Sequence, residues 1–98
     1  MFARVSFGTF PGSNKDEITK IQRTSIFPAV KSQNGYKGYV VLSNSQTGEG
    51  ITISIWESEA HMKASEASGF YKKQVAKLLP HLSGTPTMKQ YEVIIHEK

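Results

Sequence analysis

"ITISIWESEAHMKAS", residues 51–65, decides the fold because it joins a strand pattern directly to a helix pattern. The first six residues alternate between two faces, with isoleucines on one face and Thr52, Ser54 and Trp56 on the other. Ser58 can then cap a helix by accepting a hydrogen bond from its first turn. The stretch therefore predicts a strand and, after Ser58, a helix.

The sequence on both sides of this stretch supplies the other elements. We expect strands over residues 2–10, 36–43 and 88–96, a helix that begins near Asn14, and a second helical piece over 70–79 that follows the helix after Ser58. Asn14 and Glu17 resemble a capping box, and Pro28 is expected to kink or end the first helix. The turn-rich "NSQTGEG" predicts an antiparallel hairpin between the second and third strands.

The order strand, helix, strand, strand, helix, strand predicts an α+β fold of the ferredoxin-like βαββαβ type. Right-handed crossovers place both helices on one face of a four-stranded antiparallel sheet. The opposite face then has no cover from its own chain, and the strand patterns make neither face clearly polar. We therefore expect a homodimer in which the open sheet faces meet.

The bulk composition indicates one domain over residues 1–98, without repeats or linkers. There is no cysteine, which excludes disulfides, cysteine zinc sites and thiol catalysis. The opening "MFARVSFGTF" lacks the features of a signal peptide, and no apolar run is long enough to span a membrane. We expect a cytoplasmic protein with no membrane partner.

The net charge of +4 suggests nucleic acid as a partner, but the lysines are scattered. The densest group, Lys72, Lys73 and Lys77, fits the solvated side of a helix. "KGYVVLS" begins like the aromatic signature of the RNA-recognition motif, but it lacks the stacking aromatic and lies on the second strand instead of the third. We expect no nucleic-acid partner.

No pattern in the sequence predicts a metal or a cofactor. The three histidines, at positions 61, 81 and 96, show no short ligand spacing, and the chain has no phosphate-binding glycine loop, nucleophile elbow or dinucleotide fingerprint. The sequence also assigns no catalytic residue.

The chain resembles the antibiotic biosynthesis monooxygenase family. The resemblance covers nearly the whole domain and depends on the element order, on Pro28 before "NGYKGYVVL", and on "ISIWESEAHMKAS". It implies a dimeric α/β barrel formed through the sheets, and an activity such as cofactor-independent oxidation of phenols or quinols, or heme degradation. In heme-degrading members the asparagine, tryptophan and histidine positions match Ser6, Ser65 and Val75 here, so the heme-degrading set is absent.

Family members that modify polyketides have a pocket between the sheet and the helices. By resemblance, Trp56 matches their strand tryptophan, whereas Thr52 and Met62 replace an asparagine and a tyrosine, and Ala76 or Lys77 stands where they have an arginine. This pocket would turn Ser6, Thr52, Ser54 and Trp56 toward the helices and the isoleucines toward the partner subunit.

The candidate substrate-binding residues are Trp56, Thr52, Ser6, Met62 and Tyr71. An indole can stack on a planar aromatic substrate and donate one hydrogen bond, although Trp56 at a strand end can equally be a core residue. Two functions are open: a cofactor-independent monooxygenase that acts on a small phenol- or quinol-type aromatic, or a noncatalytic dimer that binds a small hydrophobic ligand.

Overall fold

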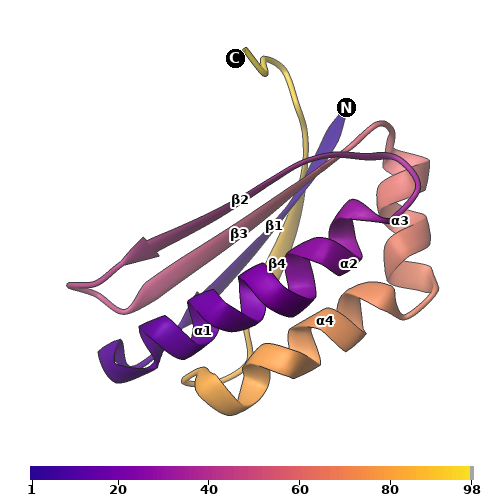
Figure 1. Cartoon of the computed structure of the whole chain (residues 1–98). Helices are drawn as coiled ribbons and strands as arrows, with labels where there is room; N and C mark the ends of the chain where they lie inside the picture. The colour runs from indigo at the N-terminus through magenta and orange to yellow at the C-terminus, as the bar shows by residue number, and fades with distance from the viewer. Residues whose placement is uncertain (98) are drawn as a thin grey trace.

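A four-stranded antiparallel sheet with helices on one face forms the protein (Figure 1); the computed structural model describes residues 1–97. The strands are β1 (Phe2–Thr9), β2 (Tyr36–Asn44), β3 (Glu49–Trp56) and β4 (Thr87–Glu92), and the α-helices are α1 (Lys15–Ile21), α2 (Phe27–Lys31), α3 (Glu59–Ala67) and α4 (Phe70–Leu78). The strand order is β2-β3-β1-β4, and each neighbouring pair is antiparallel. The predicted ferredoxin-like fold is confirmed.

The register between β1 and β3 fixes which side chains face the helices. Phe2 is opposite Trp56, Arg4 is opposite Ser54, and the next inward pair continues this face. The apolar core lies under this face, where Trp56 and Met62 are fully buried against Ile26 and Val30. The orientation of β3 implied by the family resemblance is therefore confirmed, with the isoleucines on the opposite face.

The first helical stretch is continuous but irregular. Between α1 and α2, the segment Gln22–Ile26 is a π-helix, in which backbone bonds span five residues instead of four. Pro28 lies within the first turn of α2, so the predicted disturbance at this proline takes the form of a π turn with the helix resuming. The additional residue rotates the helical residues after it, and Phe27 packs on Tyr39 with ring centroids 5.6 Å apart.

A β-bulge in β2 has a similar effect on its aromatic residues. Tyr36 is opposite Trp56 while Gly38 is opposite Ile55, so Lys37 is additional on this strand. Tyr36 and Tyr39, three positions apart, consequently both contact the ring of Phe27 on the helix side of the sheet. In a regular strand, residues three apart would face opposite sides.

Two local predictions need correction. The last strand was expected to run over residues 88–96, but β4 ends at Glu92; Val93 donates one more backbone bond to Met1, and Ile94 and Ile95 are then 80% exposed. Asn14 does precede α1, but its side chain makes no capping bond and instead donates to the backbone oxygen of His81. The predicted Ser58 cap is confirmed, since its hydroxyl accepts from the backbone N–H of His61 at 3.2 Å.

Within residues 1–97, none of the helices combines the length and the apolar character that crossing a bilayer requires.

Candidate functional site

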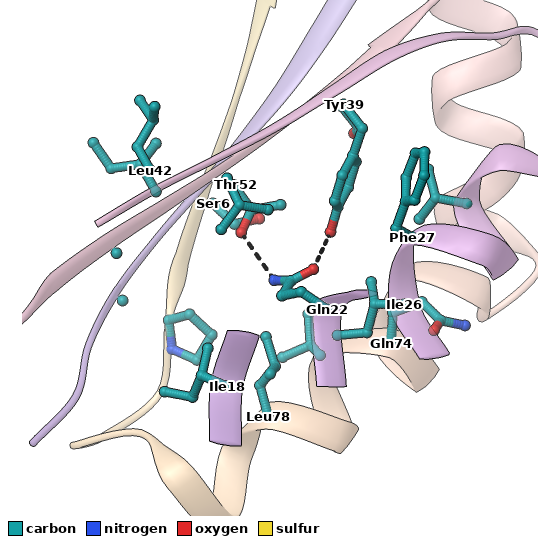
Figure 2. Close-up of a pocket in the computed structure, with 18 of the residues that line it drawn as sticks. Ser6, Ile18, Gln22, Ile26, Phe27, Tyr39, Leu42, Thr52, Gln74 and Leu78 are labelled. Carbon is teal, nitrogen blue, oxygen red and sulfur yellow. Dashed lines mark hydrogen bonds between the residues drawn. The ribbon is translucent and has the colours of Figure 1, made fainter. Parts of the chain in front are cut away.

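A cavity of about 430 Å³ lies between the sheet and the helices, beside the apolar core (Figure 2). It exists because the inward side chains become smaller along β1 and β3. The opposed inward pairs are Phe2 and Trp56, Arg4 and Ser54, Ser6 and Thr52, and Gly8 and Gly50. The large pair fills the space under the helices at one end, whereas Ser6 and Thr52 leave space beside it. At the glycine pair, the side chains of Phe10, Leu82 and Pro86 cover the sheet and line the cavity.

The cavity wall is mostly apolar. Ile18, Ile26 and Phe27 contribute from the first helical stretch, and Phe70, Val75 and Leu78 contribute from α4. The exposed residues Lys15 and Thr19 of α1 and Arg23 of the π-helix also belong to the wall, so the cavity opens to solvent along this side of the first helical stretch. Pockets for small organic ligands commonly have this form, an apolar wall with a few polar groups.

Gln22, the first residue of the π-helix, is the central polar group. It is 5% exposed and points into the cavity between Thr52 and Tyr39 (Figure 2). Its amide oxygen accepts a hydrogen bond from the Tyr39 hydroxyl at 2.5 Å, and its amide nitrogen donates to the Thr52 hydroxyl at 3.4 Å. These two bonds fix the orientation of the amide, so the cavity contains preorganised polar groups from β2, β3 and a helix.

Tyr39 is a neutral hydroxyl in this setting. Its burial raises the pKa of the phenol well above the ordinary value, and the bond to Gln22 and the charge of Arg4 offset only part of this effect. The hydroxyl therefore acts as a hydrogen-bond donor and not as a general base near neutral pH.

A second polar pair, Ser6 and Tyr71, lies on the wall formed by β1 and α4. Their hydroxyl oxygens are 2.7 Å apart. The Tyr71 ring also packs against the guanidinium of Arg4, whose Cζ lies 4.3 Å from the ring centroid. This contact ties the Ser6 and Tyr71 pair to the only cation on the inward face of β1.

Arg4 is 3% exposed and belongs to the cavity wall. Its Nη1 donates to the Ser65 hydroxyl at 2.8 Å, to Glu66 Oε2 at 3.2 Å and to the Met62 backbone oxygen at 3.4 Å. Burial lowers the pKa of Arg4 and the bond and charge of Glu66 raise it, yet a guanidinium retains its proton at neutral pH. Arg4 is thus a buried, charged group within reach of a ligand.

The structure divides the five predicted site residues into two groups. Ser6, Thr52 and Tyr71 lie together on the cavity wall. Trp56 and Met62 are fully buried in the neighbouring core and are not part of the wall, and the Trp56 indole N–H donates to the Ser54 hydroxyl at 2.9 Å. Whether Trp56 and Met62 influence a substrate stays a prediction, but both have the position of core residues.

Sequence reasoning missed Arg4, Gln22 and Tyr39. A charged residue on the inward face of a central strand was the available signal for Arg4, because a buried charge needs a partner or a function. Gln22 lies four residues after Ile18 and four before Ile26, so a polar residue on the apolar face of the first helix was the available signal for it. No comparable signal marked Tyr39, which depends on the bulge in β2.

The remaining chemistry of the wall is limited. Residues 1–97 contain no group of three histidine, aspartate or glutamate side chains arranged to hold a metal ion. In the same part of the chain, no histidine or carboxylate side chain lines the cavity. Any deprotonation of a ligand would therefore proceed without a conventional general base from the wall.

Comparison with known proteins gives matches in structure but not in sequence. No protein-family model matches the chain, and no curated protein matches it. A protein from Deinococcus radiodurans, provisionally assigned as an antibiotic biosynthesis monooxygenase, superposes with a TM-score of 0.77 at 15% identity, over 100% of this chain and 97% of that one. A second protein with the same provisional assignment, from Nitrosomonas europaea, gives 0.76 at 7% identity, over 97% of this chain and 100% of that one.

The heme degrader MhuD from Mycobacterium tuberculosis, whose structure has two hemes bound in its active site, superposes with a TM-score of 0.73 at 18% identity, with both chains covered completely. At these identities the likeness establishes the fold. The resemblance to the antibiotic biosynthesis monooxygenase proteins is thus confirmed at the level of architecture over nearly the whole chain.

Proposed function

We propose that the cavity around Gln22 binds a small phenol- or quinol-type aromatic molecule and that the protein oxidises it with molecular oxygen, without a metal or cofactor. The observation that carries the proposal is the fixed Gln22 amide between Tyr39 and Thr52 in an otherwise apolar cavity of about 430 Å³. An apolar wall suits an aromatic ring, and a few oriented polar groups can position its hydroxyls. The shared architecture with proteins named monooxygenases supports the oxidation step.

The chemistry requires no external reductant. A hydroquinone and O₂ give a hydroxyquinone and water: one oxygen atom enters the ring, the other becomes water, and the substrate supplies all four electrons. The phenolic protons leave to solvent through the mouth of the cavity, near Lys15 and Arg23. The protein contributes by holding the aromatic ring in one orientation, because correct positioning of the reactants accounts for a large part of many enzymatic rate enhancements.

Oxygen uptake tests this proposal. We expect the protein to accelerate O₂ consumption with at least one member of a panel of substituted quinols and phenols, and Gln22→Leu to lower the initial rate about tenfold or more. Gln46→Leu, the same replacement in the exposed β2–β3 turn, should leave the rate unchanged. Equal rates with and without protein over the whole panel, or equal rates for the two variants, would contradict the proposal.

A second candidate function is ligand binding without turnover. It is favoured by the absence of histidine and carboxylate side chains from the part of the wall that residues 1–97 form. If an aromatic compound raises the Tm of the protein but is not converted to a product, this second function is supported. A raised Tm together with O₂ consumption would support the oxidation of the aromatic compound.

We also propose that the protein is a homodimer through the sheet face that has no helices. The outward side chains of β1, β2 and β3 are mostly apolar, and Val40 and Leu42 are 42% and 46% exposed there. An identical sheet face can cover such a surface by a two-fold arrangement. The expected dimer would leave the cavity, on the other face of the sheet, within each protomer.

Neighbouring valines provide a matched test of the dimer. Val40 and Val41 are 42% and 44% exposed, but they lie on opposite faces of β2. In sedimentation at micromolar concentration we expect the protein and its Val41→Lys variant to be dimers and Val40→Lys to be a monomer. A monomeric unmodified protein, or equal effects of the two substitutions, would contradict this interface.

A further inference from the structure

In the described part of the chain, residues 1–97, only one side of the Arg4 guanidinium has hydrogen-bond partners. All three of its hydrogen bonds leave through Nη1, toward Ser65, Glu66 and the Met62 backbone on α3. Within residues 1–97, every fully buried side-chain nitrogen or oxygen has a hydrogen-bond partner. Because Nε and Nη2 have no hydrogen-bond partner among these described residues, they must reach accessible space, and the space that Arg4 lines is the cavity.

The charges around the cavity have one sign. Arg4 lies inside, Lys15 and Arg23 lie at the mouth, and no aspartate or glutamate of residues 1–97 belongs to the wall. Glu66 offsets part of the Arg4 charge, but it does so from α3, through Nη1. In a space with apolar walls, such a field favours an anion more strongly than it would in water.

We propose that the cavity binds its aromatic ligand as an anion, with an ionised phenolic oxygen that accepts hydrogen bonds from Nε and Nη2 of Arg4. This inference rests on the proposed function, because it specifies the ionisation state of the same ligand. It also accounts for the missing general base: anion binding lowers the pKa of the bound phenol, and the phenolic proton leaves to solvent. An ionised phenol is also the form that transfers an electron to O₂ most readily.

The groups that face Arg4 are consistent with this role. Glu66 approaches from α3, Tyr71 from α4 and Tyr39 from β2. Tyr39 stays neutral because burial raises its pKa, so no second anion competes for the inner end of the cavity near neutral pH. The phenolate oxygen would thus lie near one cation and near two tyrosine hydroxyls that carry no charge.

Para-nitrophenol is a direct probe, because its phenolate absorbs at longer wavelength than its phenol and the protonation state of the bound molecule can be read from the spectrum. We expect the apparent pKa of bound para-nitrophenol to be about 1–3 units lower than in water, as an adjacent cation produces. Its methyl ether, para-nitroanisole, has nearly the same shape and no acidic proton. It should bind at least about tenfold more weakly than the phenolate, as expected for the loss of a charge-assisted hydrogen bond.

A charge-neutral variant tests Arg4 without leaving an unpaired buried charge. Arg4→Gln combined with Glu66→Gln removes both members of the ion pair. We expect it to bind para-nitrophenolate at least about tenfold more weakly, to abolish the pKa change, and to leave para-nitroanisole binding nearly unchanged. If this variant does not fold, the comparison of the two probes on the unmodified protein decides the question alone.

The two cations at the mouth permit a second comparison. Lys15→Gln with Arg23→Gln should weaken phenolate binding a few-fold at low salt, and the difference should disappear at high salt. Lys72→Gln with Lys73→Gln removes the same charge from exposed positions of α4 that do not line the cavity, and it should have a smaller effect. Equal effects of the two pairs would contradict a directed field at the mouth.

The outcomes separate this inference from the proposed function. Tight phenolate binding with a lowered pKa, but no O₂ uptake by any quinol, would support the anion site and overturn the oxidation. Equal binding of para-nitrophenol and para-nitroanisole, with an unshifted pKa, would overturn the anion site even if O₂ uptake occurs.

Discussion

Tyr39→Phe isolates one hydrogen bond of the candidate site, because it removes a hydroxyl and retains the ring that packs on Phe27. The hydroxyl donates to Gln22 Oε1 at 2.5 Å, and no other protein group bonds to that oxygen within the described residues. A neutral hydrogen bond contributes about 0.5–1.5 kcal/mol, and a buried acceptor left unpaired costs about 1–3 kcal/mol. Because the cavity beside Gln22 can admit water, we expect a loss of about 1–2 kcal/mol in the free energy of unfolding.

This loss can be measured by urea and thermal unfolding of four proteins: the unmodified chain, Tyr39→Phe, Gln22→Leu and the double variant. Each kcal/mol corresponds to a decrease in Tm of about 4–8 °C in a domain of this size. The double variant should lose less stability than the sum of the single variants, since it removes both partners together. An unchanged Tm for Tyr39→Phe, or strict additivity in the cycle, would refute the view that this bond organises the cavity.

Three further predictions concern the core and the charged groups near the cavity. Glu66→Gln should lower the free energy of unfolding in urea by about 1–3 kcal/mol, because it leaves the buried Arg4 without its anion. Glu59→Gln removes an exposed helix ion pair with Lys63 and should cost less than about 0.5 kcal/mol. Equal losses for the two variants would contradict a special role for Glu66. Burial raises the pKa of Tyr39 in the folded state, so its contribution to stability is complete below the ordinary tyrosine value of 10.0 and is lost as pH rises above it. Unfolding free energies measured across this alkaline range should therefore fall more steeply for the unmodified protein than for Tyr39→Phe, and parallel curves would show that Tyr39 does not titrate differently in the two states. Met62→Ala should cost about 2–5 kcal/mol by the same unfolding measurement, since Met62 is fully buried against Trp56, and a loss below about 1 kcal/mol would place it outside the core.

The fold could be predicted from the sequence because each local signal agreed with the global plan. Alternation in residues 51–56, the Ser58 cap and the turn-rich hairpin connection each describe short-range structure, and the structure confirms all three. Local signals did not predict which face of β3 lies against the helices. Hydrophobicity alone would turn the isoleucines toward the helices, and only the family resemblance predicted the observed arrangement, in which a face without helices is also apolar.

The candidate site was harder to predict because two irregularities build it. The π turn that begins at Gln22 brings Phe27 against the sheet, and the bulge at Lys37 turns Tyr36 and Tyr39 to the same face. Regular periods of 3.6 and 2 residues place these side chains elsewhere. The end of β4 was missed for a related reason. Val93, Ile94 and Ile95 have strand-forming side chains, but the pairing of β4 with β1 ends at Glu92, which is opposite Phe2, the first residue of β1.

The cavity itself arises from a gradient of side-chain size along two paired strands. Each step of two residues along β1 moves one pair toward the open end, from Phe2 and Trp56 to Gly8 and Gly50. The large side chains of Phe2 and Trp56 set the distance between the helices and the sheet. The smaller side chains further along β1 and β3 do not fill that distance, and a cavity results. A sheet face that is core at one end and cavity at the other lets a small domain retain a stable fold while it provides space for a ligand.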